Sequence, residues 1–183
     1  MDLENWEGEV LNFWFNELTP KQWFVSSPEG DELIKHRFQD LVLKLAENLP
    51  DDTKTSADKS LAAILCFDQF TRNIFRGEAQ AFAYDHLALS LTQHMIEMGW
   101  DQEMDDPHKQ FTYMPLMHSE DINMQKQSLV MFRCFGDDVF QFAQDHHDIV
   151  EEFGRYPHRN KCLGRQSTLK ELEYLKDAKR FGQ

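Results

Sequence analysis

Cysteines are scarce in this sequence, and their placement argues against a disulfide-stabilised fold. Cys66, Cys134 and Cys162 are odd in number, lie far apart and form no CxxC motif. Small secreted domains pair closely spaced cysteines, whereas this pattern is typical of a reducing compartment. A chain of 183 residues buries roughly 70% of the surface that its unfolded form exposes, so it needs no disulfide or structural metal to fold.

Long apolar runs are also lacking. None approaches the roughly 18 residues that a membrane-spanning helix requires. The opening residues Met-Asp-Leu-Glu carry acids where a secretory signal has bases. We therefore expect a cytoplasmic protein with no membrane partner.

Basic residues are outnumbered by acidic ones. Nineteen Lys and Arg against 32 Asp and Glu give a formal net charge of −13 at pH 7. A charge of this sign repels polyanions, so nucleic acid is not an expected partner. The chain also has no Walker loop, no GxGxxG and no GxSxG motif, and we expect no cofactor.

A metal site is not expected either. The run of residues 145–148, Asp-His-His-Asp, contains common metal ligands, but adjacent histidines on a helix point about 100° apart. His147 and Glu151 share a helix face. The HExxH spacing and a third ligand at a known spacing are both missing.

Apolar residues recur at helical spacing along most of the chain. Trp6, Val10 and Phe13 lie on one face, and similar stripes follow, each bounded by capping or breaking residues. We predict about eight helices with short connections, interrupted by irregular stretches at residues 71–81 and 155–165. No alternating pattern indicates a strand, and no change in composition marks a domain boundary. The sequence therefore predicts a single all-α domain over residues 1–183.

Individual helix ends follow from particular residues. Pro20 is expected to stop the first helix, and Pro115 the fifth. Ser119 is expected to cap the helix that follows it. Gly99 suits a left-handed C-cap, and the last helix is expected to end near Arg180.

Chemistry-bearing residues gather in three stretches, and the first is FDQFTRNIFRG at residues 67–77. Asp68 and Arg72 lie four residues apart and so share a helix face. Gln69 lies beside them, and Arg76 follows in a turn. Either the arginines cap carbonyls and pair with Asp68, or they present a guanidinium to an anion.

The second stretch, YMPLMHSED at residues 113–121, places His118 just before an expected helix start. Glu120 and Asp121 suit the preference for acids in a first helical turn, which by itself explains them. A histidine oriented by one of these carboxylates is also able to act as an acid or a base.

The third stretch, residues 154–165, holds four cations and a histidine with no acid. The planar guanidinium of arginine suits carboxylates and phosphates bidentately. This loop is therefore solvated, paired with acids from elsewhere such as Asp68, Glu120 or Asp121, or used to hold an anion. Cys162 lies among these cations, but it has no defined base and is not expected to be a nucleophile.

The three stretches resemble the motifs of a bacterial family catalogued as a domain of unknown function. Residues 67–77 resemble LDQFPRNIFRG, residues 113–121 with Gln125 resemble YLPLEHSED…Q, and residues 153–168 resemble FGRFPHRN…LGR.ST. The likeness runs in order through nearly the whole chain. It implies an all-α, tetratricopeptide-like fold of helical hairpins and brings no established function.

The start of the chain adds to the resemblance, and a few positions depart from it. The segment VLNFWF, followed by Trp23 and Phe24, is similar to the family's VLDFWF…WF. Thr71 stands where the family's motif has proline, which leaves a backbone donor and a hydroxyl at that turn. Met117 stands where an acid is common, and residues 161–162, Lys-Cys, stand where small apolar residues are usual.

Three hypotheses follow. The leading one is a binding domain whose arginines and histidines line a groove and hold a small anionic molecule or an acidic or C-terminal peptide group. The second is an enzyme in which His118, oriented by Glu120 or Asp121, is the acid/base and the arginines clamp a phosphate or carboxylate. The third is a purely structural arginine–carboxylate network. The candidate residues are His118 and Glu120 for catalysis and, for the ligand, Asp68, Gln69, Arg72, Arg76, Asp121, Arg155, His158, Arg159, Asn160 and Arg165.

Overall fold

The computed structural model describes residues 4–176, and over this range the chain forms helices joined by turns, with no strand. The all-α prediction is confirmed. The α-helices are α1 (Trp6–Asn12), α2 (Pro20–Phe24), α3 (Pro28–Glu47), α4 (Ala57–Ile64), α5 (Thr71–Ile74), α6 (Asp85–Glu97), α7 (Asp106–His118), α8 (Ile122–Phe132), α9 (Asp137–Phe153) and α10 (Leu169–Tyr174). Shorter 3-10 and π-helical segments are η1 (Phe13–Glu17), η2 (Asp51–Thr55), η3 (Leu65–Phe70), η4 (Ala79–Phe82), η5 (Trp100–Glu103), η6 (Arg133–Phe135) and η7 (Pro157–Arg159).

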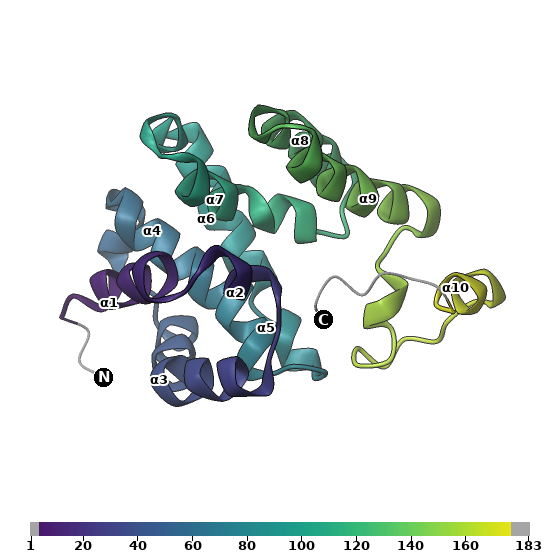
Figure 1. The fold of residues 1–183 in the computed structure, drawn as a ribbon, viewed down its shortest axis with the longest axis horizontal. Coiled ribbons are helices and arrows are strands. Elements are labelled where there is room, and N and C mark those ends of the chain that lie inside the picture. The colour runs from purple at the N-terminus through teal and green to yellow at the C-terminus, as the bar shows by residue number, and fades with distance from the viewer. Residues whose placement is uncertain (1–3, 177–183) are drawn as a thin grey trace.

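The helices from α6 to α9 pack in chain order. Each of them contacts the next, and α4 packs against both α1 and α6. Figure 1 shows α1 to α5 gathered on one side and α8 and α9 lying together beyond α7. The segment after α9 leads to α10, which lies far from α1 in this view. None of the described helices is long and apolar enough to cross a membrane.

Aromatic side chains fill the main core. Trp14 and Phe38 pack against Phe70, with ring centroids 5.6 and 4.7 Å from it, and all three side chains are buried. Burying a side chain of this size contributes roughly 1.5–3 kcal/mol. A smaller cluster of Ile149, Val150 and Tyr156 lies under the loop that follows α9. The core thus ties the N-terminal helices to the helix that carries the first motif stretch.

The helix of the first motif stretch contains a π-helical turn. The turn η3 continues α4 and runs directly into α5, and it carries Asp68 and Gln69. A π turn accommodates one more residue than an α turn and therefore changes the direction in which the following side chains point. The Thr71 hydroxyl donates to the Phe67 carbonyl over 2.7 Å and so satisfies this carbonyl within the turn. The proline of the family's motif has no hydroxyl for this role.

The helix boundary predicted at Gly99 is confirmed, whereas the one predicted at Pro115 is wrong. Gly99 has a left-handed φ of 71° after α6. The stop predicted before Pro20 is also confirmed: the first helical segment ends at Glu17, and Pro20 begins α2, because the fixed φ of proline suits a first turn. Pro115 lies inside α7, which continues to His118. All residues of α7 from position 111 onward are buried, so tertiary packing outweighs the loss of one backbone hydrogen bond.

Two further predicted helix boundaries lie in the C-terminal half of the chain. Asp121, and not Ser119, caps α8 by accepting from the Asn123 N–H at 2.7 Å. Ser119 has extended backbone after the end of α7. The predicted end of the last helix near Arg180 lies outside the described residues.

Truncation of Phe70 tests the aromatic core. We expect Phe70→Ala to lower the free energy of unfolding by about 3–5 kcal/mol, because the removed ring leaves a cavity among Trp14, Phe38 and their neighbours. Urea unfolding followed by circular dichroism measures the change. Phe142→Ala makes the same chemical change at a side chain that is 54% exposed and should cost less than about 1 kcal/mol. Equal losses in the two variants would contradict the assignment of Phe70 to the core.

Candidate functional site

The fold brings the three motif stretches into contact around His118. Its Nδ1 lies 2.8 and 2.9 Å from the two carboxylate oxygens of Asp68, in the first stretch. Its carbonyl accepts from Nη1 of Arg159, in the third stretch, at 3.0 Å. Arg165 of the third stretch donates to both carboxylate oxygens of Glu120, in the second, at 2.6 and 2.9 Å. Segments up to ninety residues apart in the sequence therefore meet at one place.

Asp68 is a buried carboxylate held by three donors. It is 1% exposed and is contacted by His118, by Nε2 of Gln69 at 2.5 Å and by Nη1 of Arg72 at 3.4 Å. Burial by itself raises the pKa of this carboxyl, but the charge of Arg72, the charge of His118 where it is protonated at low pH, and the hydrogen bonds from His118 and Gln69 outweigh it. The pKa of Asp68 therefore lies well below its ordinary value, and the group is ionised.

His118 is neutral in this environment. Burial lowers the pKa of the imidazole, Asp68 raises it, and the nearby charges of Arg72 and Arg159 lower it again, so that the net pKa lies below 6.5. Since the Asp68 carboxylate accepts at Nδ1, this nitrogen carries the proton and Nε2 carries the lone pair. The ring is thus held in one tautomer by its partner.

The arginines of the three stretches are paired with carboxylates inside the protein. Four of them form two-oxygen pairs, which are Arg72 with Asp85, Arg76 with Asp31, Arg155 with Glu171 and Arg165 with Glu120. Arg159 lies 3.7 Å from Asp85 and stacks over the rings of Phe82 and Tyr156 at 4.6 and 4.4 Å. These contacts match the internal pairing that the third hypothesis describes.

The carboxylate that orients His118 is not one of the two that the enzyme hypothesis predicts. Asp68 contacts the ring, whereas Glu120 accepts from Arg165 and from the Tyr156 N–H at 2.7 Å. Asp121 is occupied as the cap of α8. The physical reason is the extended backbone at Ser119, since residues beyond it no longer share a helical face with His118. Glu120 and Asp121 therefore do not orient the His118 ring, and the enzyme hypothesis is wrong on this point.

A cavity of about 420 Å³ lies beside His118. Residues of α2, η3, α5, α7, the end of α8 and α9 line it. One part of the lining is apolar and includes Trp23, Phe24, Met114, Phe132 and Phe142. A volume of this size suits a small organic molecule.

The polar part of the cavity lining comes mainly from the first two motif stretches. Gln69, Arg72, Arg76 and His118 all line it, together with His146 of α9. Arg72 is 8% exposed, and its Nε is a buried donor with no hydrogen-bond partner in the described part of the chain. A buried donor without a partner costs about 1–3 kcal/mol. This nitrogen has essentially no accessible surface, so other atoms of Arg72 form the cavity wall.

Several predicted ligand residues do not line the cavity. Asp68 and Arg159 lie behind His118 and hold it, while Arg155 pairs with the buried Glu171 of α10. The remaining ones are Asp121, His158, Asn160 and Arg165, and Glu120, predicted for catalysis, does not line the cavity either. The Asn160 side chain donates to Ser167 at 3.0 Å. Together these contacts fix the loop after α9 to the start of α10.

Sequence reasoning missed the acids that pair with the arginines. Asp85 pairs with two of them and Asp31 with a third. Both acids lie in the first turn of a helix, where an acid has an ordinary explanation in the helix dipole. No spacing links either acid to its partner. His146 was also set aside, yet its ring lies 6.1 Å from that of His118.

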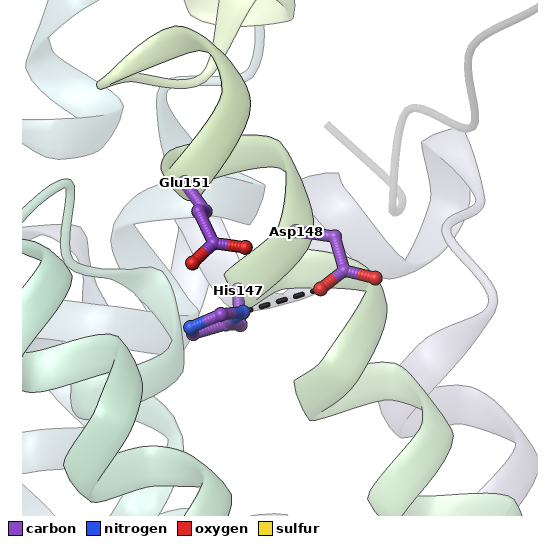
Figure 2. Close-up of side chains that lie close together, drawn as sticks. All are labelled: His147, Asp148 and Glu151. Carbon is purple, nitrogen blue, oxygen red and sulfur yellow. Dashed lines mark hydrogen bonds and ion pairs between the residues drawn. The ribbon is translucent and has the colours of Figure 1, made fainter.

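Figure 2 shows a further group of potential metal ligands on α9. The ligand atoms of His147, Asp148 and Glu151 lie within 4.8 Å of one another, and the dashed line marks the 3.2 Å contact of His147 with Asp148. All three come from one helix, and both carboxylates are exposed. No other His, Cys, Asp or Glu of residues 4–176 joins this group. We infer no site from it.

Comparisons with known proteins identify relatives of unknown function. A family model described as a bacterial protein of unknown function, DUF924, matches residues 10–179. A solved structure of a protein of unknown function from Agrobacterium tumefaciens is 35% identical and superposes with a TM-score of 0.91 over 97% of this chain and 100% of that one. A search of curated proteins found no match.

Removal of the Asp68 charge tests the buried pair. We expect Asp68→Asn to lower the free energy of unfolding at pH 7.5 by about 3 kcal/mol or more, because the buried Arg72 loses a compensating carboxylate and His118 loses the acceptor of its Nδ1 proton. Asp40→Asn makes the same change at an exposed residue of α3 and should cost less than about 0.5 kcal/mol. Urea unfolding of both variants checks the expectation. A cost for Asp68→Asn as small as that of the control would show that the pair contributes little.

The pH dependence of stability tests the burial of His146. Burial, and then the charge of His118, lower the pKa of His146 from 6.5 to about 3. As the pH falls, the unfolded chain therefore binds this proton first, so the stability due to neutral His146 is lost progressively below pH 6.5. We expect His146→Gln to lose less stability than the wild type between pH 7.5 and 5.0. The exposed-site control His36→Gln should lose as much as the wild type, and a His146→Gln slope equal to it would refute this account.

Proposed function

We propose that this chain, which belongs to the DUF924 family of bacterial proteins of unknown function, binds a small amphipathic molecule in the cavity beside His118. The ligand has an apolar body and a carboxylate or carbonyl head. The observation that carries the proposal is the divided lining of the cavity, apolar on one part and rich in hydrogen-bonding groups on the other. Such a division is typical of sites that both hold and orient a small molecule.

The apolar lining supports a hydrophobic body of limited size. Trp23 and Phe24 come from α2, Met114 from α7 and Phe142 from α9. Transfer of one methylene group from water into such surroundings contributes about 0.8 kcal/mol. Methionine adapts its shape to different apolar groups. An alkyl or aryl group of about ten carbon atoms agrees with a cavity of about 420 Å³.

The polar lining supports a head group that accepts hydrogen bonds. The guanidinium groups of Arg72 and Arg76 are already neutralised by Asp85 and Asp31, so the cavity offers donors without a large excess of positive charge. The side chains of Arg72 and Arg76 both line the cavity. A carboxylate or carbonyl oxygen suits the N–H groups of a guanidinium. The anion-binding hypothesis, which included the arginines of all three stretches, is therefore restricted to Arg72 and its neighbours.

Two finer expectations also belong to the proposal. The packing of α6 to α9 in chain order supports the tetratricopeptide-like arrangement that the resemblance implies. Three unpaired cysteines support residence in the reducing cytoplasm. The net charge of −13 continues to disfavour nucleic acid as a partner.

Titration with decanoate tests the proposed binding. We expect saturable binding of decanoate by isothermal titration calorimetry, and weaker binding of a dicarboxylate of the same length, whose second charge has to enter the apolar part. Met114→Trp fills the cavity and should weaken decanoate binding at least tenfold. Met98→Trp makes the same change at a side chain that is 54% exposed and lies outside the cavity, and it should bind as the wild type does.

A second variant guards against a folding defect in Met114→Trp. Phe142 lines the cavity but is 54% exposed, so Phe142→Glu should fold normally. Its added negative charge should weaken decanoate binding. Absence of saturable binding by the wild type, or wild-type affinity in both cavity variants, would overturn the proposal.

A further inference from the structure

Asp68 and His118 differ from the other histidine–carboxylate contacts of the described residues. The pair His108–Asp105 lies on one helix end and is partly exposed, and Asp148, the partner of His147, is 60% exposed. Asp68 is 1% exposed and lies fifty residues before His118 in the chain. Only His118 among these three histidines lines the cavity. Asp68 thus holds the His118 imidazole at the cavity wall, and Asp68 itself lies outside the lining.

The charges around this pair show what His118 contributes. Arg72 lies between Asp68 and Asp85, and Arg159 lies close to Asp85. Two buried cations therefore already balance two carboxylates without His118. A neutral imidazole gives Asp68 a hydrogen bond but no compensating charge. The contact of Nδ1 with both carboxylate oxygens of Asp68 instead fixes the direction and tautomer of the ring. This is the role of a carboxylate behind a catalytic histidine.

The atom presented to the cavity follows from this contact. Nδ1 is bound to Asp68, and Asp68 itself is not part of the lining. The lone pair is therefore on Nε2, on the other side of the ring. Burial, as the largest influence, lowers the pKa of His118, so the ring is unprotonated at neutral pH. A neutral imidazole of fixed tautomer beside a cavity is suited to accept a proton.

We propose that the chain is a hydrolase of carboxylic esters, in which His118 removes a proton from a water molecule in the cavity and Asp68 positions the imidazole. This inference rests on the binding function proposed above, with the acyl group of the ester as the apolar body. Among the reactions open to a single base beside a guanidinium, water-dependent hydrolysis needs the fewest groups. Its co-reactant is water alone.

Hydrolysis begins with the addition of water to the ester and ends with the loss of the alkoxide. Nε2 of His118 takes a proton as the water oxygen forms a bond to the ester carbonyl carbon, and the π electron pair moves to the carbonyl oxygen. The guanidinium of Arg72, which lines the cavity, stabilises the negative charge on this oxygen. The carbonyl then re-forms, the bond to the alkoxy oxygen breaks, and the leaving alkoxide takes the proton from Nε2. The products are an alcohol and a carboxylic acid that loses its proton to solvent, and His118 is neutral again.

Hydrolysis of 4-nitrophenyl octanoate by the intact chain tests the proposal. We expect saturable release of nitrophenolate, with His118→Gln lowering kcat/KM at least 100-fold, since a positioned general base contributes roughly 10²–10⁴-fold. His36→Gln alters an exposed histidine of α3 and should retain wild-type turnover. Because the pKa of His118 is lowered, the rate should stay constant as the pH falls to 6.5 and decline only below it.

Asp68→Asn separates positioning from structure. We expect a lower kcat at an unchanged KM, and a decline of the rate at a lower pH than in the wild type, because the carboxylate that raises the pKa of His118 is gone. A merely structural role of Asp68 would leave the pH profile of the remaining activity unchanged. Asp40→Asn is the matched control on the surface.

Failure of catalysis is distinguishable from failure of binding. Decanoate should inhibit the wild type competitively with an inhibition constant equal to its dissociation constant, and it should still bind His118→Gln. If decanoate binds but the wild type is no faster than His118→Gln, the catalytic proposal is wrong and the binding proposal stands. If decanoate does not bind, both are wrong. Loss of folding in His118→Gln would leave the inhibition and the pH profile of the wild type as the deciding measurements, and non-competitive inhibition would overturn the proposal.

Discussion

The buried carboxylate of Asp68 is the interaction on which the centre of the molecule depends. A charge removed from water costs several kcal/mol unless donors surround it closely. The donors here are Gln69, Arg72 and His118, and His118 comes from a helix fifty residues further along the chain. Satisfying one carboxylate therefore requires η3 and the end of α7 to lie together. The same constraint defines the wall of the cavity, because His118 presents its other side to it.

The cluster of arginines in a protein of charge −13 has an internal explanation. Arg72 and Arg159 are nearest to Asp85, and Arg165 to Glu120. Each arginine meets an acid that the sequence places elsewhere, so the local excess of positive charge disappears in three dimensions. What remains for a ligand is smaller and more specific than a basic groove. It consists of the Arg72 guanidinium, one neutral imidazole and an apolar space beside them.

The local structure of η3 and α7 places Asp68 and His118 where they meet. The π turn η3 interrupts the α-helical repeat just where Asp68 and Gln69 occur. Pro115 lies near the end of α7 within a fully buried segment, and the helix continues to His118. The period of apolar residues predicts neither feature, since both depend on how the helix packs against its neighbours.

The amino-acid sequence by itself determined the helical class, most helix positions and the three stretches that matter, because periodicity, caps and residue chemistry are local properties. Asp68 and His118 were identifiable as candidates for the same reason. Only the tertiary structure decided which acid meets which base. Asp68 replaces Glu120 as the partner of His118, and Asp31 and Asp85 proved essential as arginine partners. Ion pairs form between side chains that are close in space, and the number of residues between them in the chain does not indicate that distance.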